Sequence, residues 1–168
     1  GTIALQNQLS GMTSASMPSG SVVQHVNFAI NGAGGSAATT ATSWIDTGLS
    51  ITITPKLSSS NLVVSFTQGI GASKGTNPTA RFDWKLYCVS PSVILANNTF
   101  IGTEALNSGG TARMQIAGSG TYNNTSTAAK TFKVQVRKAS GSHTECGVLY
   151  YLWYNGGKHT MQVFEVAV

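Results

Sequence analysis

The sequence predicts an all-β protein: an antiparallel β-sandwich of jelly-roll type with about nine strands and an extended N-terminal arm. Three observations lead to this fold class. Short runs of alternating apolar and polar residues recur along the chain, and Gly, Ser, Thr and Asn fill the segments between them. No segment combines the length and the capping residues of a helix. Only 9% of the 168 residues are charged and 41% are hydrophobic, a balance that argues against a disordered chain.

The chain divides into an N-terminal arm, residues 1–20, and one knob domain, residues 21–168. In the arm, Ile3, Leu5, Leu9 and Met12 form a thin apolar stripe that is too short for a stable isolated helix. We expect these four residues to contact a partner on which the arm becomes ordered; a loose terminus is the alternative. No run approaches the roughly 18–20 apolar residues of a membrane span, and we expect no membrane partner.

The first predicted strands alternate apolar with polar or small residues. They are Ser21–Ile30, the segment SWIDTGLSITITP at 43–55, Leu62–Phe66 and Phe82–Cys88. In the second, Leu49, Ile51 and Ile53 alternate strictly with polar residues, and Pro55 ends the strand. The tripeptide Asp46-Thr47-Gly48 predicts a turn or bulge before it.

The later strands follow the same rule. Two moderate strands, Val93–Thr103 and Thr111–Ala117, are followed by small polar loops at Asn107–Gly110 and Gly118–Thr127. Next, Phe132, Val134 and Val136 face away from Thr131, Lys133, Gln135 and Arg137. The chain ends on a strand, Thr160–Val168, with Phe164, Val166 and Val168 on one face.

The segment Glu145–Asn155, ECGVLYYLWYN, is apolar on both faces of a predicted strand. A sandwich strand needs only one apolar face, so something must cover the second, and another copy of the chain is the simplest candidate. We therefore predict a subunit interface at Tyr150, Leu152, Trp153 and Tyr154. A platform on which these aromatic rings stack against sugars is the alternative.

The sequence offers no convincing catalytic or metal site, so we expect a non-enzymatic protein without cofactors. Gly71–Gly75 matches the G-x-S-x-G pattern of serine hydrolases, but no helix pattern follows it. The histidines, His25, His143 and His159, have no ligand spacing. The five acidic residues form no local pair, although a glycosidase could assemble two distant carboxylates.

The remaining reactive and charged residues favour structural roles. Cys88 and Cys146 each lie in an apolar strand and are expected to be buried free thiols, with a disulfide as the alternative. Asp83 lies between Arg81 and Lys85 on one strand face, which indicates that it balances their charge rather than acts as an acid or base.

The net charge is +5, and the densest basic group is Lys130, Lys133, Arg137 and Lys138. We interpret it as the polar side of an amphipathic strand, with a weak anion-binding surface as the alternative, and we expect no nucleic-acid partner.

Several segments together resemble a group of bacteriophage structural proteins and tail-fibre-like tips. They are MPSGSVVQ at 17–24, SWIDTGLSITITPKLSSSNLVVSF at 43–66, TFKVQVR at 131–137 and the closing strand from Met161 to Val168. The similarity is strongest in DTGLSITITP and TFKVQVR, and it is poor across Gly69–Asn124, where partner-specific loops are expected.

The resemblance implies a virion surface protein, a compact β-sandwich knob that works as a homotrimer, and it transfers no catalytic or binding residue. On this basis we expect a capsid decoration (cement) protein on the exterior of the phage particle, with the major capsid protein as partner of the arm. The receptor-binding tip of a tail fibre, with tail or fibre partners, is the first alternative, and it is favoured if Gly1 begins a fragment. A carbohydrate-binding lectin-like module, with a host surface glycan as partner, is the second.

Overall fold

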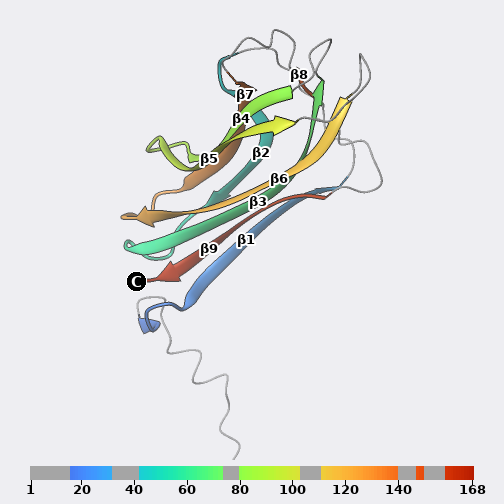
Figure 1. Ribbon diagram of the computed structural model, residues 1–168. Helices are drawn as coiled ribbons and strands as arrows, with labels where there is room; N and C mark the ends of the chain where they lie inside the picture. The colour runs from blue at the N-terminus through green and yellow to red at the C-terminus, as the bar shows by residue number, and fades with distance from the viewer. Residues whose placement is uncertain (1–15, 32–41, 74–79, 103–110, 140–146, 150–157) are drawn as a thin grey trace, which may run out of the picture.

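The computed structural model describes residues 16–31, 42–73, 80–102, 111–139, 147–149 and 158–168. Within them, nine strands form two antiparallel sheets packed face to face (Figure 1). In chain order they are β1 (Val22–Asn31), β2 (Ile45–Ile53), β3 (Ser60–Ser73), β4 (Ala80–Cys88), β5 (Val93–Gly102), β6 (Thr111–Asn124), β7 (Lys130–Lys138), β8 (Gly147–Leu149) and β9 (Lys158–Ala167). The all-β prediction is confirmed. No helix in this part of the chain is long and apolar enough to cross a membrane.

The strand order is that of a jelly roll. One sheet runs β1-β9-β3-β6, with the short β8 also paired to β3, and the other runs β2-β7-β4-β5. The pairings are nested, because β4 pairs with β5, β3 with β6, β2 with β7 and β1 with β9. The chain is therefore one long antiparallel hairpin rolled on itself, and the roll closes where β3 meets β9 and β4 meets β7.

The core lies between the sheets and consists of the apolar positions that alternate along each strand. Its largest fully buried apolar side chains are Phe82, Phe132, Leu49, Ile53, Leu62, Leu86 and Met161. The predicted inward positions of β2, β3, β4 and β7 are confirmed. The predicted bulge is also present, because the register of β2 against β7 shifts between Asp46 and Ser50, and Gly48 has a φ of 80°.

The prediction of a polar loop from Gly118 onward is wrong up to Asn124. Strand β6 continues through these residues and pairs with β3 along its whole length. The glycines suggested a loop, but they allow close packing: a Cβ on Gly118 would lie 2.6 Å from the Trp84 ring and 2.8 Å from Phe66. The ring of Trp84 thus fills the space that a side chain at position 118 would occupy.

Strand β9 turns the face that carries Phe164 and Val166 outward. Its buried positions are His159, Met161, Val163, Glu165 and Ala167. Phe164 and Val166, which the sequence places together on one face, therefore lie on the outside of the five-stranded sheet. This orientation puts a carboxylate in the interior and leaves apolar side chains on the surface.

The buried carboxylate of Glu165 is fully hydrogen-bonded. It accepts from the backbone N–H of Lys56 (2.8 Å) and Leu57 (2.9 Å), from the Ser60 hydroxyl (3.0 Å) and from Gln24 Nε2 (2.7 Å). Burial alone would raise the pKa of Glu165, but these donated hydrogen bonds lower it below its ordinary value. Glu165 thus ties the turn between β2 and β3 to strands β1 and β9.

The C-terminus and the entry to β1 lie at the same end of the sandwich (Figure 1). The N–H of Gly20 donates to the carbonyl of Ala167 at 2.8 Å, and the N–H of Ala167 donates to the carbonyl of Ser21 at 2.9 Å. These bonds attach the segment that precedes β1 to the end of β9.

Candidate functional site

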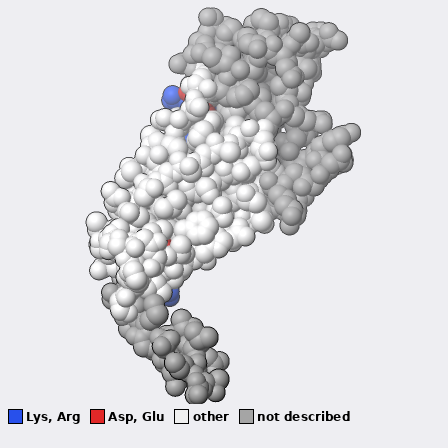
Figure 2. All heavy atoms as spheres, turned by 60° about the horizontal axis from the view of Figure 1, so that its bottom comes forward, with Lys and Arg blue, Asp and Glu red and all other residues white. Residues whose placement is uncertain are grey.

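The outer faces of the two sheets differ in charge. On the four-stranded sheet, Asp46, Asp83, Lys85, Lys133 and Arg137 all point outward. On the five-stranded sheet, none of the outward side chains that the structure describes is charged. Figure 2 shows a face of the molecule on which the described atoms are largely uncharged and Lys or Arg atoms lie near the margins.

A row of polar side chains crosses the four-stranded sheet. Asp83 on β4 lies opposite Thr99 on β5 and opposite Arg137 on β7. Its Oδ1 accepts from the Thr99 hydroxyl at 2.7 Å, and its Oδ2 accepts from Arg137 Nε at 2.9 Å. The side chain of Asp83 is only 14% exposed, so both bonds hold its carboxylate in one orientation.

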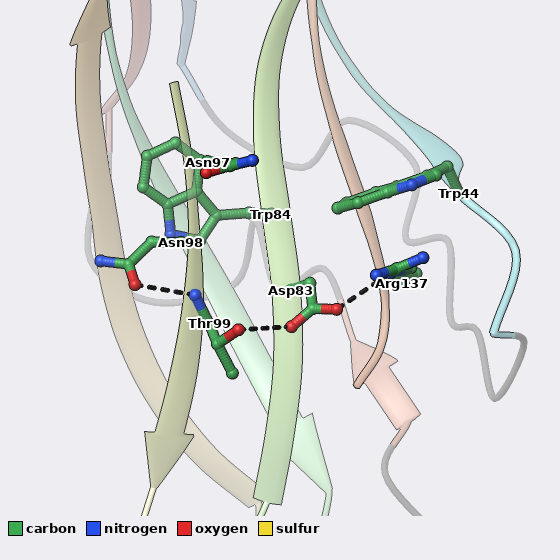
Figure 3. A pocket seen from close by; sticks show the side chains of 7 residues that line it. All are labelled: Trp44, Asp83, Trp84, Asn97, Asn98, Thr99 and Arg137. Carbon is green, nitrogen blue, oxygen red and sulfur yellow. Dashed lines mark hydrogen bonds and ion pairs between the residues drawn. The ribbon is translucent and has the colours of Figure 1, made fainter. Parts of the chain in front are cut away.

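A groove of about 330 Å³ opens around Asp83. It is lined by Trp44, Asp83, Trp84, Asn97, Asn98, Thr99 and Arg137. In Figure 3, Trp44 and Arg137 stand on one side of Asp83, and Asn97, Asn98 and Thr99 stand on the other. The groove therefore has a cationic, aromatic wall and a wall of amide and hydroxyl groups.

Two cations contact the indole of Trp44. Arg137 Cζ lies 4.5 Å from the ring centroid and Lys85 Nζ lies 4.6 Å from it, within the range of cation–π contacts. Lys85 Nζ is also 4.8 Å from the ring of Tyr87. Burial lowers the pKa of Lys85, and repulsion from Arg137 lowers it further. Among the described residues, no carboxylate forms a salt bridge with Lys85.

Most of the basic group predicted from the sequence is paired locally. Lys133 Nζ lies 2.6 Å from Asp46 Oδ2, and Gln135 Nε2 donates to Asp46 Oδ1 at 2.6 Å. Burial alone would raise the pKa of Asp46, but the hydrogen bonds from Lys133 and Gln135 lower it. Lys130 is buried and its Nζ donates to Ser126 Oγ at 3.3 Å. Asp83 pairs with Arg137, it forms no salt bridge with Lys85, and the side chain of Arg81 lies outside the described residues.

The outer face of the five-stranded sheet carries an apolar strip, which we define as Val22, Val63, Phe164 and Val166. Phe164 lies opposite Val63 and Val166 lies opposite Val22, so the four side chains are neighbours across β1, β9 and β3. The ring of His25 stacks on Phe164 with centroids 4.3 Å apart. Val22 is 54% exposed. Uncharged polar residues surround the strip, which makes this face suited to contact with another protein surface.

Two polar side chains lie inside the sandwich near the start of β9. His159 is buried, and its Nδ1 accepts from the N–H of Gly69 at 3.1 Å. Burial lowers the pKa of His159. Gln68 is also buried, and its Oε1 has no hydrogen-bond partner in the described part of the chain.

The residues predicted as contact sites fall outside the described residues. This holds for the interface residues Tyr150, Leu152, Trp153 and Tyr154 and for the arm residues Ile3, Leu5, Leu9 and Met12. Of the strand predicted at 145–155, only β8 (Gly147–Leu149) is described, and it pairs with β3. These predictions remain untested.

Other sequence predictions can be placed. Gly71, Ala72 and Ser73 continue β3 in its pairing with β6 and β8, and residues 74–79, which include the rest of the G-x-S-x-G match, lie outside the described residues. Cys88 is a buried free thiol, as predicted, and Cys146 lies outside the described residues. In the part of the chain that is described, no three His, Cys, Asp or Glu side chains are grouped to hold a metal ion.

The groove was not predicted from the sequence. Its members come from the residue before β2 and from β4, β5 and β7, and they meet only because those strands pair. The sequence does show that Asn97 and Thr99 share one face of β5 and that Asp83 and Lys85 share one face of β4. No residue pattern within either strand indicates that β4 and β5 pair, and only this pairing brings the four residues together.

Comparisons with known proteins identify no family for this chain and find only distant structural similarity. No protein-family model matches the sequence, and no curated protein matches it. Among solved structures, the chain is similar to Eiger TNF from S. frugiperda, at 11% identity over 65% of this chain and 60% of that one, with a TM-score of 0.33. It is also similar to VP2 of infectious bursal disease virus in a subviral particle, at 12% identity over 88% of this chain and 38% of that one, with a TM-score of 0.39.

A third similar structure is a CocE/NonD family hydrolase from Staphylococcus aureus, at 9% identity over 88% of this chain and 33% of that one, with a TM-score of 0.34. This chain thus spans 60% of the length of the first of these proteins and 38% of the second. Likenesses this weak carry no argument about function. The class of the protein, an antiparallel jelly roll, is defined by its own strand order.

Proposed function

We propose that this chain is a non-enzymatic structural protein of a bacteriophage particle. It would form a homotrimeric jelly-roll knob on the outer surface of the virion and would decorate the capsid. The observation that carries the proposal is the apolar strip on an uncharged outer sheet face. The sequence resemblance in DTGLSITITP and TFKVQVR supports the phage context and the threefold state.

The apolar strip favours contact with another copy of the chain. The central residue of the strip, Phe164, stacks on His25. It faces outward because its neighbour in the strand, Glu165, points into the core. The Phe164 ring is half-buried and Val22 is exposed, so the chain gains if a partner covers the strip, because burying apolar surface is favourable by about 25 cal/mol per Å². The uncharged surroundings add no repulsion between identical copies, which a basic surface would.

Two experiments test the proposal. The first locates the protein: an antibody against this chain is applied to assembled particles and imaged by electron microscopy. Label over the head supports decoration, and label confined to the tail tips would replace decoration with the fibre-tip alternative. Absence of label from every particle would refute both.

The second experiment measures the oligomeric state by light scattering after size-exclusion chromatography. We expect the wild type to have three times the mass of the 17.4 kDa chain and Val63→Lys to be monomeric, because a lysine on β3 would place a charge in the contact. Thr54→Lys adds the same charge at an exposed position just after β2 and should leave the trimer intact. A monomeric wild type, or equal masses for the two variants, would refute the role of the strip.

The groove around Asp83, with its amide, hydroxyl and indole groups, supports a carbohydrate-binding role as a second candidate function. A lectin role and a virion role are compatible, because a surface knob can bind a glycan of the host.

A further inference from the structure

We propose that the groove around Asp83 binds an acidic sugar, a pyranose that carries a carboxylate. The ligand's carboxylate would bind at the wall formed by Trp44 and Arg137, where Lys85, in contact with the same Trp44 ring, adds positive charge. Its hydroxyl groups would bind Asn97, Thr99 and Asp83 on the polar wall. The proposal concerns the isolated chain, so it holds or fails independently of where the protein sits on a particle.

The cationic wall has unused donors. Arg137 gives only its Nε–H to Asp83, and the terminal N–H groups of its guanidinium have no acceptor among the described residues. Those terminal groups form a fork that matches a carboxylate. Lys85 adds a second positive charge, since both cations contact the same Trp44 ring and no described acid forms a salt bridge with Lys85. An anion bound at Arg137 beside the Trp44 ring would be attracted by both charges.

The polar wall offers both donors and acceptors. The carboxamide of Asn97 forms no hydrogen bond with the described residues, so its oxygen and its N–H groups are available. The carboxylate of Asp83 accepts one bond on each oxygen and keeps a lone pair on each. A sugar hydroxyl, which donates and accepts at once, can use both kinds of group.

The position of Asp83 selects among anions. Its carboxylate lies in the middle of the groove, between Thr99 and Arg137. A phosphate or a nucleic-acid backbone would place its charge against this carboxylate and be repelled. A sugar acid can instead place its single charge at the cationic wall and direct hydroxyl groups toward Asp83.

The groove is also rigid and of suitable size. Its side chains other than Trp44 stand on paired strands, and ion pairing fixes Asp83 and Arg137 before any ligand arrives, which lowers the entropic cost of binding. A volume of about 330 Å³ lies at the small end of the range for small-molecule sites. It therefore suits a short saccharide, and the Trp44 indole supplies an apolar ring beside it.

The test titrates the full chain with matched sugar pairs, D-glucuronic acid against D-glucose and D-galacturonic acid against D-galactose, followed by heteronuclear NMR. We expect saturable shifts with the acids and binding at least about tenfold weaker with the neutral sugars, the effect of one charge-assisted hydrogen bond. Raising the salt concentration should weaken binding of the acids.

Two variant pairs separate the groove from general charge. Lys85→Gln and Lys133→Gln each remove one positive charge from the same sheet face, but only Lys85 contacts Trp44, which lines the groove, whereas Lys133 is paired with Asp46. Asn97→Ala and Asn123→Ala each remove an exposed asparagine, from the groove and from the opposite sheet face. We expect the first member of each pair to weaken acid binding about tenfold or more and the second to leave it unchanged.

Three results would overturn the proposal. The first is the absence of saturable binding of either acid. The second is equal binding of the acid and neutral sugars, and the third is an equal loss in both members of either variant pair. All four substituted side chains point outward, so circular dichroism and thermal melting should show folded variants throughout.

Discussion

Replacing Glu165 by Gln should destabilise the fold strongly, although the two side chains have nearly the same shape. The carboxylate of Glu165 accepts from four donors and is fully buried. A glutamine has one acceptor oxygen in place of two and carries no charge. Its amide N–H groups would also face donors, Gln24 Nε2 or the backbone N–H of Leu57.

The size of the effect follows from the hydrogen bonds. A hydrogen bond to a charged group contributes about 1.5–3 kcal/mol and a neutral one about 0.5–1.5 kcal/mol, a difference of about 1–1.5 kcal/mol per bond. Because bonds within one network are not additive, neutralising the acceptor shared by four donors should cost roughly 2–4 kcal/mol rather than the full sum. Domains of ordinary stability unfold with about 5–15 kcal/mol, so the loss is a large share of the total. The melting temperature should fall by about 4–16 °C.

The assay is urea unfolding of wild type and Glu165→Gln at one protein concentration, over a range of pH. The folded-state pKa of Glu165 is lowered, so its stabilisation is complete above the ordinary value of 4.5 and is lost as pH falls through the lowered pKa. The difference between the two proteins should therefore be largest at neutral pH and should narrow on acidification.

A graded variant makes the test sharper. Ser60→Ala removes one donor to the carboxylate and one acceptor of Asn124 Nδ2, which keeps its bond to the Leu57 carbonyl, so it should cost only about 1–2 kcal/mol. The reasoning is wrong if Glu165→Gln unfolds within 1 kcal/mol of wild type at neutral pH, or if the difference stays constant as the solution is acidified.

Three further predictions concern other positions. Gly118→Ala should cost about 1–3 kcal/mol and alter the near-ultraviolet dichroism of Trp84, because the added Cβ would lie 2.6 Å from that ring; an unchanged melting temperature would contradict the packing. His159 has a lowered pKa in the fold, so stability should decline as pH falls below 6.5, where the unfolded chain takes up the proton first, and His159→Gln should remove that slope. Asp46→Asn should cost less than about 1 kcal/mol at low salt and still less at high salt, because the pair with Lys133 is exposed; a larger loss would show that the pair is not a surface interaction.

The strands themselves could be predicted because their signal is local. Leu49, Ile51 and Ile53 alternate with polar residues, and this period of two is a property of one strand that needs no partner. The bulge at Asp46-Thr47-Gly48 was predictable for the same reason, since a glycine with positive φ is a local requirement.

The residue pattern within one segment was misleading at a glycine inside a strand, and it was indecisive where both faces of a strand carry apolar residues. Gly118 was assigned to a loop because glycine is common in loops, but it lies in a strand to make room for Trp84, which is distant in sequence. On β9, the alternation placed Phe164, Val166 and Val168 on one face but could not decide which face is buried. The face with Glu165 is buried, because donors from three other segments satisfy its carboxylate.

The sequence alone therefore determined the class of fold, most of the strands and the inward positions of β2, β4 and β7, since each follows from the alternation of side chains along one strand. Only the tertiary structure decided which strands are neighbours. That choice brings Thr99, Asp83 and Arg137 into one row across three strands, and it aligns Val63 with Phe164 on the opposite face. Strand pairing depends on contacts between distant segments, so neither the groove nor the apolar strip has a signature within any single segment.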